Sequence, residues 1–262
     1  MQVFGTGKSD VGKVRANNED TIYVNNEGLG NLPNLFIVAD GMGGHNAGEV
    51  ASAGAVEAFC NHLREISDTI NNDADSIMDL LTQCLELANR NVHGDAQNTP
   101  DHAGMGTTFT ACVINEDRLI YAHVGDSRVY LFHDNTDSGF DNGEPIVQLT
   151  RDHTLVADMV DAGSVTPDDA RCHPNKNILT RAVGTDTGVI IDSGIVSLEN
   201  VKYVLMCTDG LTDMLDDTVM REIITTDSSI SEKIDTMIAK ALDAGGDDNI
   251  SVILIGGVTN DS

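Results

Sequence analysis

Four aspartates stand where short apolar runs of the chain begin or end. Asp40, Asp126 and Asp209 each follow such a run, and Asp248 precedes one. A carboxylate beside a buried strand is unfavourable unless it is ion-paired, hydrogen-bonded or bound to a metal. With 42 acidic and 15 basic residues, ion pairing satisfies only some of the carboxylates. One Asp-Gly pair alone is typical of an ordinary turn, but the four together predict a site for hard cations such as Mg²⁺ or Mn²⁺, since zinc would favour His or Cys.

A second group of charged residues lies near the N-terminus. Arg15 falls five positions before Asp20, and Glu19 lies next to that aspartate. A guanidinium can bind a phosphate through two parallel hydrogen bonds. Taken alone, Arg15 is more often a surface residue and Asp20 more often a turn residue, so this group by itself does not assign a function.

Three local patterns imitate other functional sites. The segment Gly5–Ser9 ends like a phosphate-binding loop, but Gln2 stands where that motif requires glycine. Cys84 and Arg90 have the spacing of a cysteine phosphatase, but no glycine separates them and the cysteine lies on an apolar helical face, so we predict a core thiol. The acidic segment 134–144 lacks the ligand spacing of an EF-hand, and a solvated loop is predicted there.

The elements that position these residues follow from the pattern of apolar residues. Short, β-branched apolar runs predict strands at Leu35–Val38, Thr107–Ile114, Leu119–Val124, Val129–Phe132, Val189–Ile195, Tyr203–Met206 and Ile250–Ile255. Helical periodicity and composition predict helices at Ala47–Leu63, around the apolar face Ile77–Val92, at Thr218–Ile224 and at Ser231–Leu242. Because strands occur in groups and helices in groups, we predict an α+β fold of antiparallel sheet packed against helices.

Composition narrows the class of protein. The 262 residues are expected to form one domain, residues 1–258, in which the polar segment 151–176 forms an exposed functional loop that we call the flap. A formal net charge of −27 would repel nucleic acid and anionic lipid, so neither is an expected partner, although solubility alone explains much of the charge. Without a long apolar run or a signal peptide, a cytoplasmic monomer is expected. Five scattered cysteines predict free thiols.

Eight short motifs occur in order along the chain, and together they resemble one known family. The motifs are Asn18–Asp20, Asp40–His45, Gly104–Thr108, Val124–Arg128, Leu149–His153, Arg181–Gly184, Cys207–Leu211 and Gly246–Asn249. They resemble the protein phosphatase 2C family, the metal-dependent (PPM-type) serine/threonine phosphatases, in its compact bacterial form. The resemblance covers nearly the whole chain. It implies a central β-sandwich of two antiparallel sheets flanked by helices, with the metal site at one end.

The resemblance also implies roles for the acidic residues at two core metal ions. Asp40 would bridge the two ions, and the backbone carbonyl of Gly41 would bind one of them. Asp209 and Asp248 would bind the other ion, and Arg15 would hold the substrate phosphate. Two neighbouring cations would then activate a bridging water for in-line attack on phosphorus, without a covalent intermediate.

Further acidic residues would take supporting roles by the same resemblance. Glu19 and Asp20 would hold metal-bound waters. Asp126 would contribute to a third, weaker metal site of the kind that bacterial members have, together with Asp209 or Asp213.

One position departs from the pattern of some relatives, chiefly eukaryotic, which place a histidine directly after Asp-Gly as the general acid. Met42 occupies that position here, so the acid that protonates the leaving group stays open. His45 lies three residues further on and is a candidate for proton transfer, against a structural or substrate-contacting role. His123 and His153 are predicted to be structural.

The resemblance implies hydrolysis of phosphoserine and phosphothreonine in phosphoproteins, with Mn²⁺ or Mg²⁺ as cofactor. The substrates would be targets of a serine/threonine kinase, or the kinase itself. Two alternatives are a catalytically weak module of the same fold that binds phosphoproteins, and an acidic protein that binds cations without turnover. The first is disfavoured because every expected metal-ligand side chain is acidic. Hydrolysis of p-nitrophenyl phosphate with and without Mn²⁺ separates all three.

Overall fold

The apolar runs of the sequence form strands, and in the computed structural model, which describes residues 3–44, 47–66, 71–133 and 145–257, these strands make two antiparallel sheets. The first sheet has the order β1 (Phe4–Asp10), β11 (Ile250–Gly256), β10 (Val201–Cys207), β7 (Arg128–His133), β8 (Ile146–Gln148). The second has the order β2 (Asp20–Asn25), β3 (Leu35–Met42), β5 (Phe109–Asn115), β6 (Arg118–Val124), β9 (Asp192–Ser197), with the short β4 (Gly106–Thr107) paired to β3.

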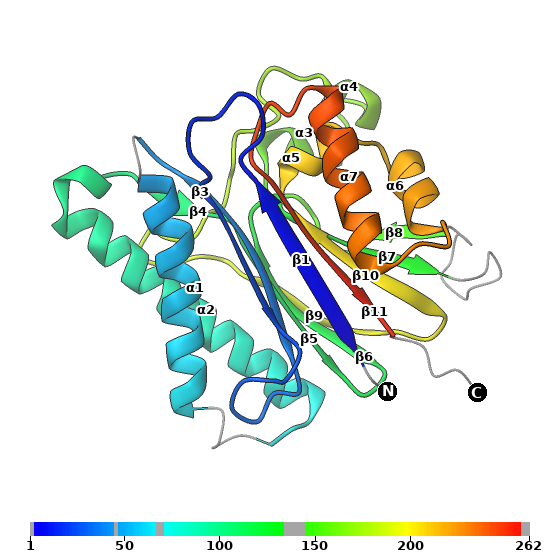
Figure 1. Ribbon diagram of the computed structural model, residues 1–262. Coiled ribbons are helices and arrows are strands. Elements are labelled where there is room, and N and C mark those ends of the chain that lie inside the picture. The colour runs from blue at the N-terminus through cyan, green and yellow to red at the C-terminus, as the bar shows by residue number, and fades with distance from the viewer. Residues whose placement is uncertain (1–2, 45–46, 67–70, 134–144, 258–262) are drawn as a thin grey trace.

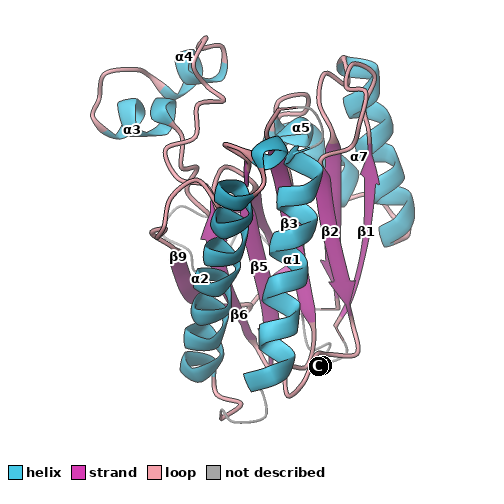
Figure 2. Ribbon diagram, turned by 90° about the vertical axis from the view of Figure 1, so that its left-hand side faces the viewer, coloured by secondary structure: helices cyan, strands magenta, loops and turns pink. Residues whose placement is uncertain are grey.

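Helices cover the outer face of each sheet, which gives four layers (Figures 1 and 2). The second sheet is covered by α1 (Ala47–Ile66) and α2 (Ala74–Asn98), which is followed by the 3₁₀ turn η2 (Pro100–His102). The first sheet is covered by α5 (Asp209–Thr212), α6 (Asp217–Ile224) and α7 (Ile230–Ala244). The predicted α+β sandwich of two antiparallel sheets with flanking helices is confirmed.

The core lies in three layers, and β3 shows why its sequence is apolar throughout. Ile37 packs in the cluster beneath α1 and α2, together with Phe59, whereas Val38 packs in the cluster between the two sheets, together with Ile253. Successive strand residues point to opposite faces, and both faces of this strand are covered. A third cluster fills the space between the first sheet and its helices.

Two long helices begin and end at residues that satisfy their free backbone groups. The side chain of Asp73 accepts a hydrogen bond from the Ser76 N–H at the start of α2. The apolar face that the sequence predicts for this helix is buried. Helix α7 starts with a capping box between Ser229 and Glu232 and ends at Gly245, which adopts a positive φ of 154°. Within the described segments no helix is long and apolar enough to cross a membrane.

Several local predictions need correction. Strands β1, β2 and β8 were not predicted, because their residues are only partly buried and carry little apolar patterning. The flap is not a plain loop: it contains α3 (Leu155–Asp161) and α4 (Pro167–Arg171), whose first turns are capped by Thr154 and Thr166. The predicted strand at Val189–Ile195 begins only at Asp192. The predicted solvated loop 134–144 lies outside the described residues.

Two of the local patterns that imitate other functional sites form ordinary structural elements. Gly7, Lys8 and Ser9 lie within β1, paired along their length with β11, so they form a strand instead of a phosphate-binding loop. The predicted free cysteines are confirmed. Cys84 is fully buried on α2, and burial raises the pKa of its thiol to about 12, which keeps it protonated and unreactive.

Candidate active site

The four strand-end aspartates meet at the end of the sandwich where α3, α4 and α5 lie (Figure 1). Asp40 lies near the end of β3, Asp126 follows β6, Asp209 begins α5 directly after β10, and Asp248 precedes β11. All four line one cavity of about 300 Å³, which we call the carboxylate pocket. Its lining also includes Arg15, Glu19, Gly41, Met42, Gly43, Thr108, Asn177, Leu179 and Asn249.

The backbone around Asp40 is fixed from both sides. Its N–H donates to the hydroxyl of Thr108, and its carbonyl accepts the Thr108 N–H, each over 2.8 Å. The next residue, Gly41, donates its N–H to the carbonyl of Glu19 over 3.1 Å. A Cβ at Gly41 would lie 2.0 Å from the carbonyl oxygen of Gly48, so only glycine fits there. The backbone of Gly41 is therefore held at a fixed position in the lining of the pocket.

The N-terminal carboxylates are attached to the same framework. Asp20 pairs with Asp40 in the register of β2 and β3, and one of its oxygens accepts the Thr208 hydroxyl over 2.9 Å. The side chain of Asn249 accepts the Glu19 N–H over 2.8 Å and donates to the carbonyls of residues 11 and 17. These bonds tie the N-terminal segment to the strand that follows Asn249.

Sequence reasoning did not assign roles to Thr108, Thr208 or Asn249, which hold the acidic residues in place. All three lie within the motifs quoted above; Thr208 and Asn249 stand next to an aspartate, whereas the motif of Thr108 contains no acidic residue. A polar residue that is adjacent to a strand-end carboxylate is the signal that points to such a supporting role, because a buried carboxylate needs hydrogen-bond donors around it.

The acidic side chains that line the pocket, and Asp20 beside it, are poorly solvated and repel one another. Burial raises the pKa of Asp20 to about 7, and burial together with the charges of Asp213 and Asp248 raises that of Asp209 to about 6. Burial and the neighbouring aspartates also raise the pKa of Asp40 well above its usual range. One buried oxygen of Asp20 and one of Asp209 have no hydrogen-bond partner. A bound cation would satisfy both oxygens and relieve the repulsion.

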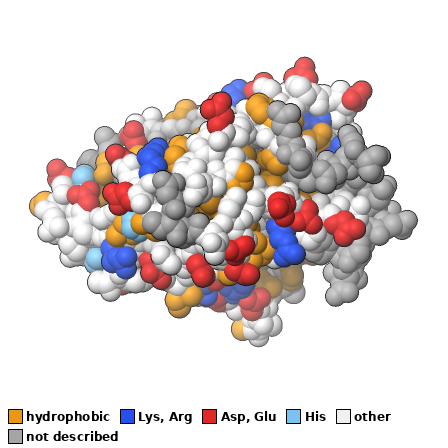
Figure 3. Space-filling model, turned by 90° about the horizontal axis from the view of Figure 1, so that it is seen from below, with side chains coloured by type: hydrophobic (Ala, Val, Ile, Leu, Met, Phe, Trp, Pro, Cys, Tyr) orange, Lys and Arg blue, Asp and Glu red, His pale blue; other side chains and the backbone are white. Residues whose placement is uncertain are grey.

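The oxygen atoms that could bind a metal in the pocket suit a hard divalent cation. They are carboxylate oxygens and the Gly41 carbonyl, with no cysteine or histidine in the described lining. Within the described residues no three His, Cys, Asp or Glu side chains form a ready-made metal shell. Mg²⁺ does not require one, since it usually keeps several waters and takes only one or two carboxylates from the protein. In contrast, acidic residues at the opposite end of the molecule lie scattered among basic and apolar ones (Figure 3).

Arg15 stands at the edge of the carboxylate pocket. One guanidinium nitrogen lies 2.7 Å from a carboxylate oxygen of Asp248, and the arginine side chain is 52% exposed. Since a guanidinium carries five N–H donors, this ion pair leaves donors for a second anion. The arginine therefore lines the pocket with N–H donors that its ion pair with Asp248 does not use.

The remaining candidates occupy different surroundings. Asp126 is buried in the pocket, and burial and the charge of Asp209 raise its pKa. Asp213 forms an ion pair with Lys176 of the flap, 2.6 Å long, so its role as a metal ligand stays a prediction. His45 lies outside the described residues.

Two buried histidines lie behind the pocket. His153 donates its backbone N–H to the carbonyl of Gly125 over 2.8 Å, and its ring nitrogen Nδ1 accepts the Gly125 N–H over 3.0 Å. The ring of His123 lies between the hydroxyl of Thr110 and the carbonyl of Arg151. Burial lowers the pKa of both imidazoles, to about 4 for His123. His153 thus braces the turn that leads to Asp126, and His123 ties β6 to the start of the flap.

Comparison with known proteins agrees with this site. Residues 11–243 match the family model described as protein phosphatase 2C. The chain is 38% identical to the serine/threonine phosphatase stp of Listeria welshimeri over 95% of this chain and 93% of that protein. It resembles the solved structure of the S. agalactiae serine/threonine phosphatase, with a TM-score of 0.85 and 33% identity over 97% of this chain and 99% of that chain.

A further similar structure bears on the metal. The catalytic domain of the serine/threonine protein phosphatase PstP, in complex with two manganese ions, matches with a TM-score of 0.77 and 33% identity over 97% of each chain. Fold, site and relatives together define a phosphoric ester hydrolase of the protein phosphatase class. The chain belongs to the protein phosphatase 2C family.

Proposed function

We propose that this protein hydrolyses phosphoserine and phosphothreonine in phosphoproteins, with Mn²⁺ or Mg²⁺ in the carboxylate pocket. The observation that carries the proposal is the convergence of poorly satisfied carboxylates beside one arginine, at the rigid end of a family-typical sandwich. Each of these acidic residues is costly to the folded protein unless a cation joins it. The site is therefore better explained by function than by stability.

The residues of the pocket would divide the work as follows. Asp40, Asp209, Asp248 and the carbonyl of Gly41 hold the cations at positions fixed by β3, α5 and β11. Cations bound there supply activation of water as a nucleophile and neutralisation of phosphoryl charge. Arg15 binds the phosphoryl oxygens and orients the ester in the pocket. Asp126 belongs to a weaker, third cation site.

We further propose that the substrates are targets of a serine/threonine kinase, or the kinase itself. The relatives stp and PhpP are named as phosphatases, the first of them specifically for serine and threonine. The formal charge of −27 favours substrates whose phosphorylated segment carries basic residues or is presented close to the metal end, where cations offset the negative field.

The decisive experiment measures phosphate release from a phosphothreonine peptide and from p-nitrophenyl phosphate, with Mn²⁺, with Mg²⁺ and with a chelator. We expect turnover of both substrates that depends on the metal and returns when metal is restored. Tight binding of the phosphopeptide without turnover would instead support a phosphoprotein-binding module. Binding of many weak cations without turnover would support a cation-binding protein.

A further inference from the structure

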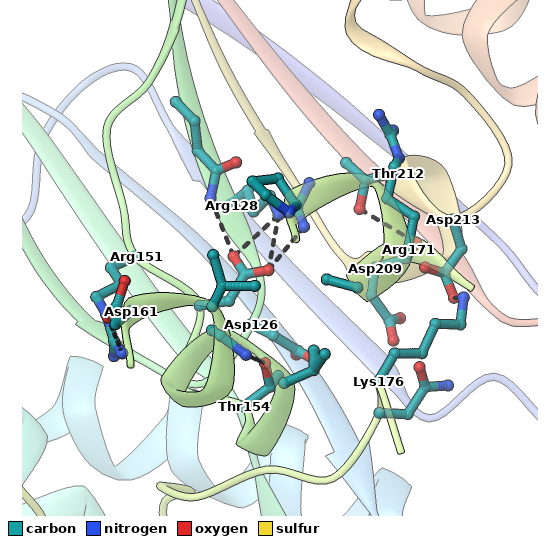
Figure 4. A pocket seen from close by; sticks show the side chains of 18 residues that line it. Asp126, Arg128, Arg151, Thr154, Asp161, Arg171, Lys176, Asp209, Thr212 and Asp213 are labelled. Carbon is teal, nitrogen blue, oxygen red and sulfur yellow. Dashed lines mark hydrogen bonds and ion pairs between the residues drawn. The ribbon is translucent and has the colours of Figure 1, made fainter. Parts of the chain in front are cut away.

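A second cavity opens beside the carboxylate pocket, between the flap and α5. It has a volume of about 350 Å³, within the usual range of ligand pockets, and we call it the side cavity (Figure 4). Asp126, Asp209 and Asn177 line both cavities. A ligand held in the carboxylate pocket therefore has direct access to the side cavity.

One wall of the side cavity is apolar and is formed by the two short helices of the flap. Val156, Ala157 and Val160 of α3 contribute to it, with Pro167 and Ala170 of α4. None of these five side chains belongs to the packed cores found among the described residues. Figure 2 shows why, since the flap projects beyond the sandwich and its layers. Val156 is nevertheless buried, so the part of the wall that is available to a ligand is formed by Ala157, Val160, Pro167 and Ala170.

The charged residues that line the side cavity are largely neutralised by one another. Arg128 forms a forked ion pair with Asp152, and Arg151 binds Asp161 (Figure 4). Lys176 pairs with Asp213, as described above. The two other acidic residues of the lining belong to the proposed cation sites. Arg171 also lines the cavity, and no ion pair among the described residues neutralises it. A ligand therefore meets little unpaired negative charge once cations are bound, and the apolar wall is the part of the lining that it can bury without desolvating a charge.

We propose that the side cavity binds an aliphatic side chain of the substrate, next to the phosphorylated residue in sequence. This inference rests on the proposed function, because the phosphate must first occupy the carboxylate pocket. The shared lining residues place the two subsites side by side, as neighbouring residues of an extended peptide require. A Leu, Ile, Val or Met side chain matches the chemistry of the wall and fits within the cavity.

The test uses phosphothreonine peptides that differ only in the residues one and two positions before or after the phosphothreonine. Each of these positions carries Leu, Ala, Lys or Glu in turn, and kcat/KM is measured by phosphate release with Mn²⁺. At one position or more, we expect the Leu peptide to exceed the Ala peptide by about tenfold, the scale of a side chain that fills an apolar pocket. Leu and Ala peptides whose values agree within twofold at every position would overturn the proposal, whatever the values of the Lys and Glu peptides.

Variants of α3 then test whether the side cavity causes the preference for Leu over Ala in the peptide. Ala157→Leu places a larger side chain at the apolar wall, where it competes with a substrate side chain, and should reduce the Leu-to-Ala ratio towards one. Ala162→Leu adds the same side chain at an exposed position just beyond α3 that does not line the cavity, and it should keep the ratio of the unaltered protein. If Ala157→Leu does not fold, Val160→Thr, which replaces one methyl group by a hydroxyl, should also lower the ratio. A ratio that survives in the folded variant contradicts the assignment.

Failure of this inference can be told apart from failure of the proposed function. If the unaltered protein does not hydrolyse p-nitrophenyl phosphate with Mn²⁺, the proposed function itself is wrong. If it hydrolyses p-nitrophenyl phosphate but treats the Leu and Ala peptides alike, only the side cavity has been misassigned. Circular dichroism and thermal unfolding confirm that each variant is folded before its ratio is interpreted.

Discussion

The carboxylate pocket and the flap border each other, but different interactions hold them in place. Asp40 and Asp209 lie at the ends of β3 and β10, which belong to fully packed sheets. The flap is attached mainly by its two ends and by ion pairs such as Lys176–Asp213, and its helices have only five and seven residues. Rigid elements carry the groups that need fixed geometry, whereas the exposed segment offers a surface that can vary with the substrate.

The two regions also differ in what their charges contribute to the folded protein. In the carboxylate pocket like charges are crowded, so that region lowers stability until cations bind. In the flap opposite charges are paired at partly exposed positions, so each pair adds little to stability. This difference predicts that stability depends strongly on metal and pH through the carboxylate pocket. The attachment of the flap, in contrast, should depend on its local contacts.

The largest effect is expected from Asp209→Asn, which removes one negative charge from the proposed cation site. We expect kcat/KM for p-nitrophenyl phosphate to fall by about 100-fold or more, since electrostatic stabilisation supplies most of the catalysis. The metal-free variant should be at least as stable as the unaltered protein, because a repelled buried carboxylate is gone. Asp243→Asn, at an exposed position of α7, is the matched control. Activity above a tenth of the unaltered protein's would contradict the assignment.

The next effect concerns the pH dependence of the metal-free protein. The pKa values of Asp20 and Asp209 are raised from 3.8 to about 7 and about 6, so the folded protein binds more protons than the unfolded chain between about pH 4 and 7. Its stability must then decrease as pH rises through this window, by about 2 kcal/mol or more. Thermal unfolding in a chelator at pH 5, 6, 7 and 8 measures the trend, and Asp209→Asn should reduce it. A melting temperature that increases with pH in the chelator would be the contrary result.

A smaller effect is expected from Arg15→Ala, which probes substrate binding at the edge of the pocket. Loss of a charge-assisted contact of about 1.5–3 kcal/mol should raise KM roughly tenfold or more. Inhibition by inorganic phosphate should weaken in parallel, while metal affinity measured by calorimetry stays nearly the same. Arg15→Lys should recover part of the loss, because it keeps the charge without the planar fork. Lys13→Ala, a nearby basic residue that does not line the pocket, should leave KM unchanged.

The smallest change in stability is expected from Lys176→Met, which removes the ion pair between the flap and Asp213. The pair is about one-third exposed, so its loss should reduce the free energy of unfolding by no more than about 1 kcal/mol. Limited proteolysis should nevertheless cut within the flap faster than in the unaltered protein. Lys240→Met on α7 should show neither effect. An unchanged cleavage rate would mean that other contacts hold the flap.

The sequence alone identified the parts of the protein that depend on local patterns. The apolar runs at Tyr203–Met206 and Ile250–Ile255 form β10 and β11, and the face from Ile77 to Val92 is the buried face of α2. The acidic residues that now line the carboxylate pocket were singled out because a carboxylate beside a buried strand needs a partner. These features require only neighbours in sequence, so periodicity and residue type are enough to find them.

Tertiary structure decided the features that depend on distant residues. Strand β1 has an alternation too weak to notice, and its pairing with β11, at the far end of the chain, makes it a strand. The ion pair of Lys176 with Asp213 and the shared lining of the two cavities join segments that are far apart in sequence. Such contacts arise only when the sandwich brings its strand ends together, because the identity of a residue does not specify which remote residue will lie beside it.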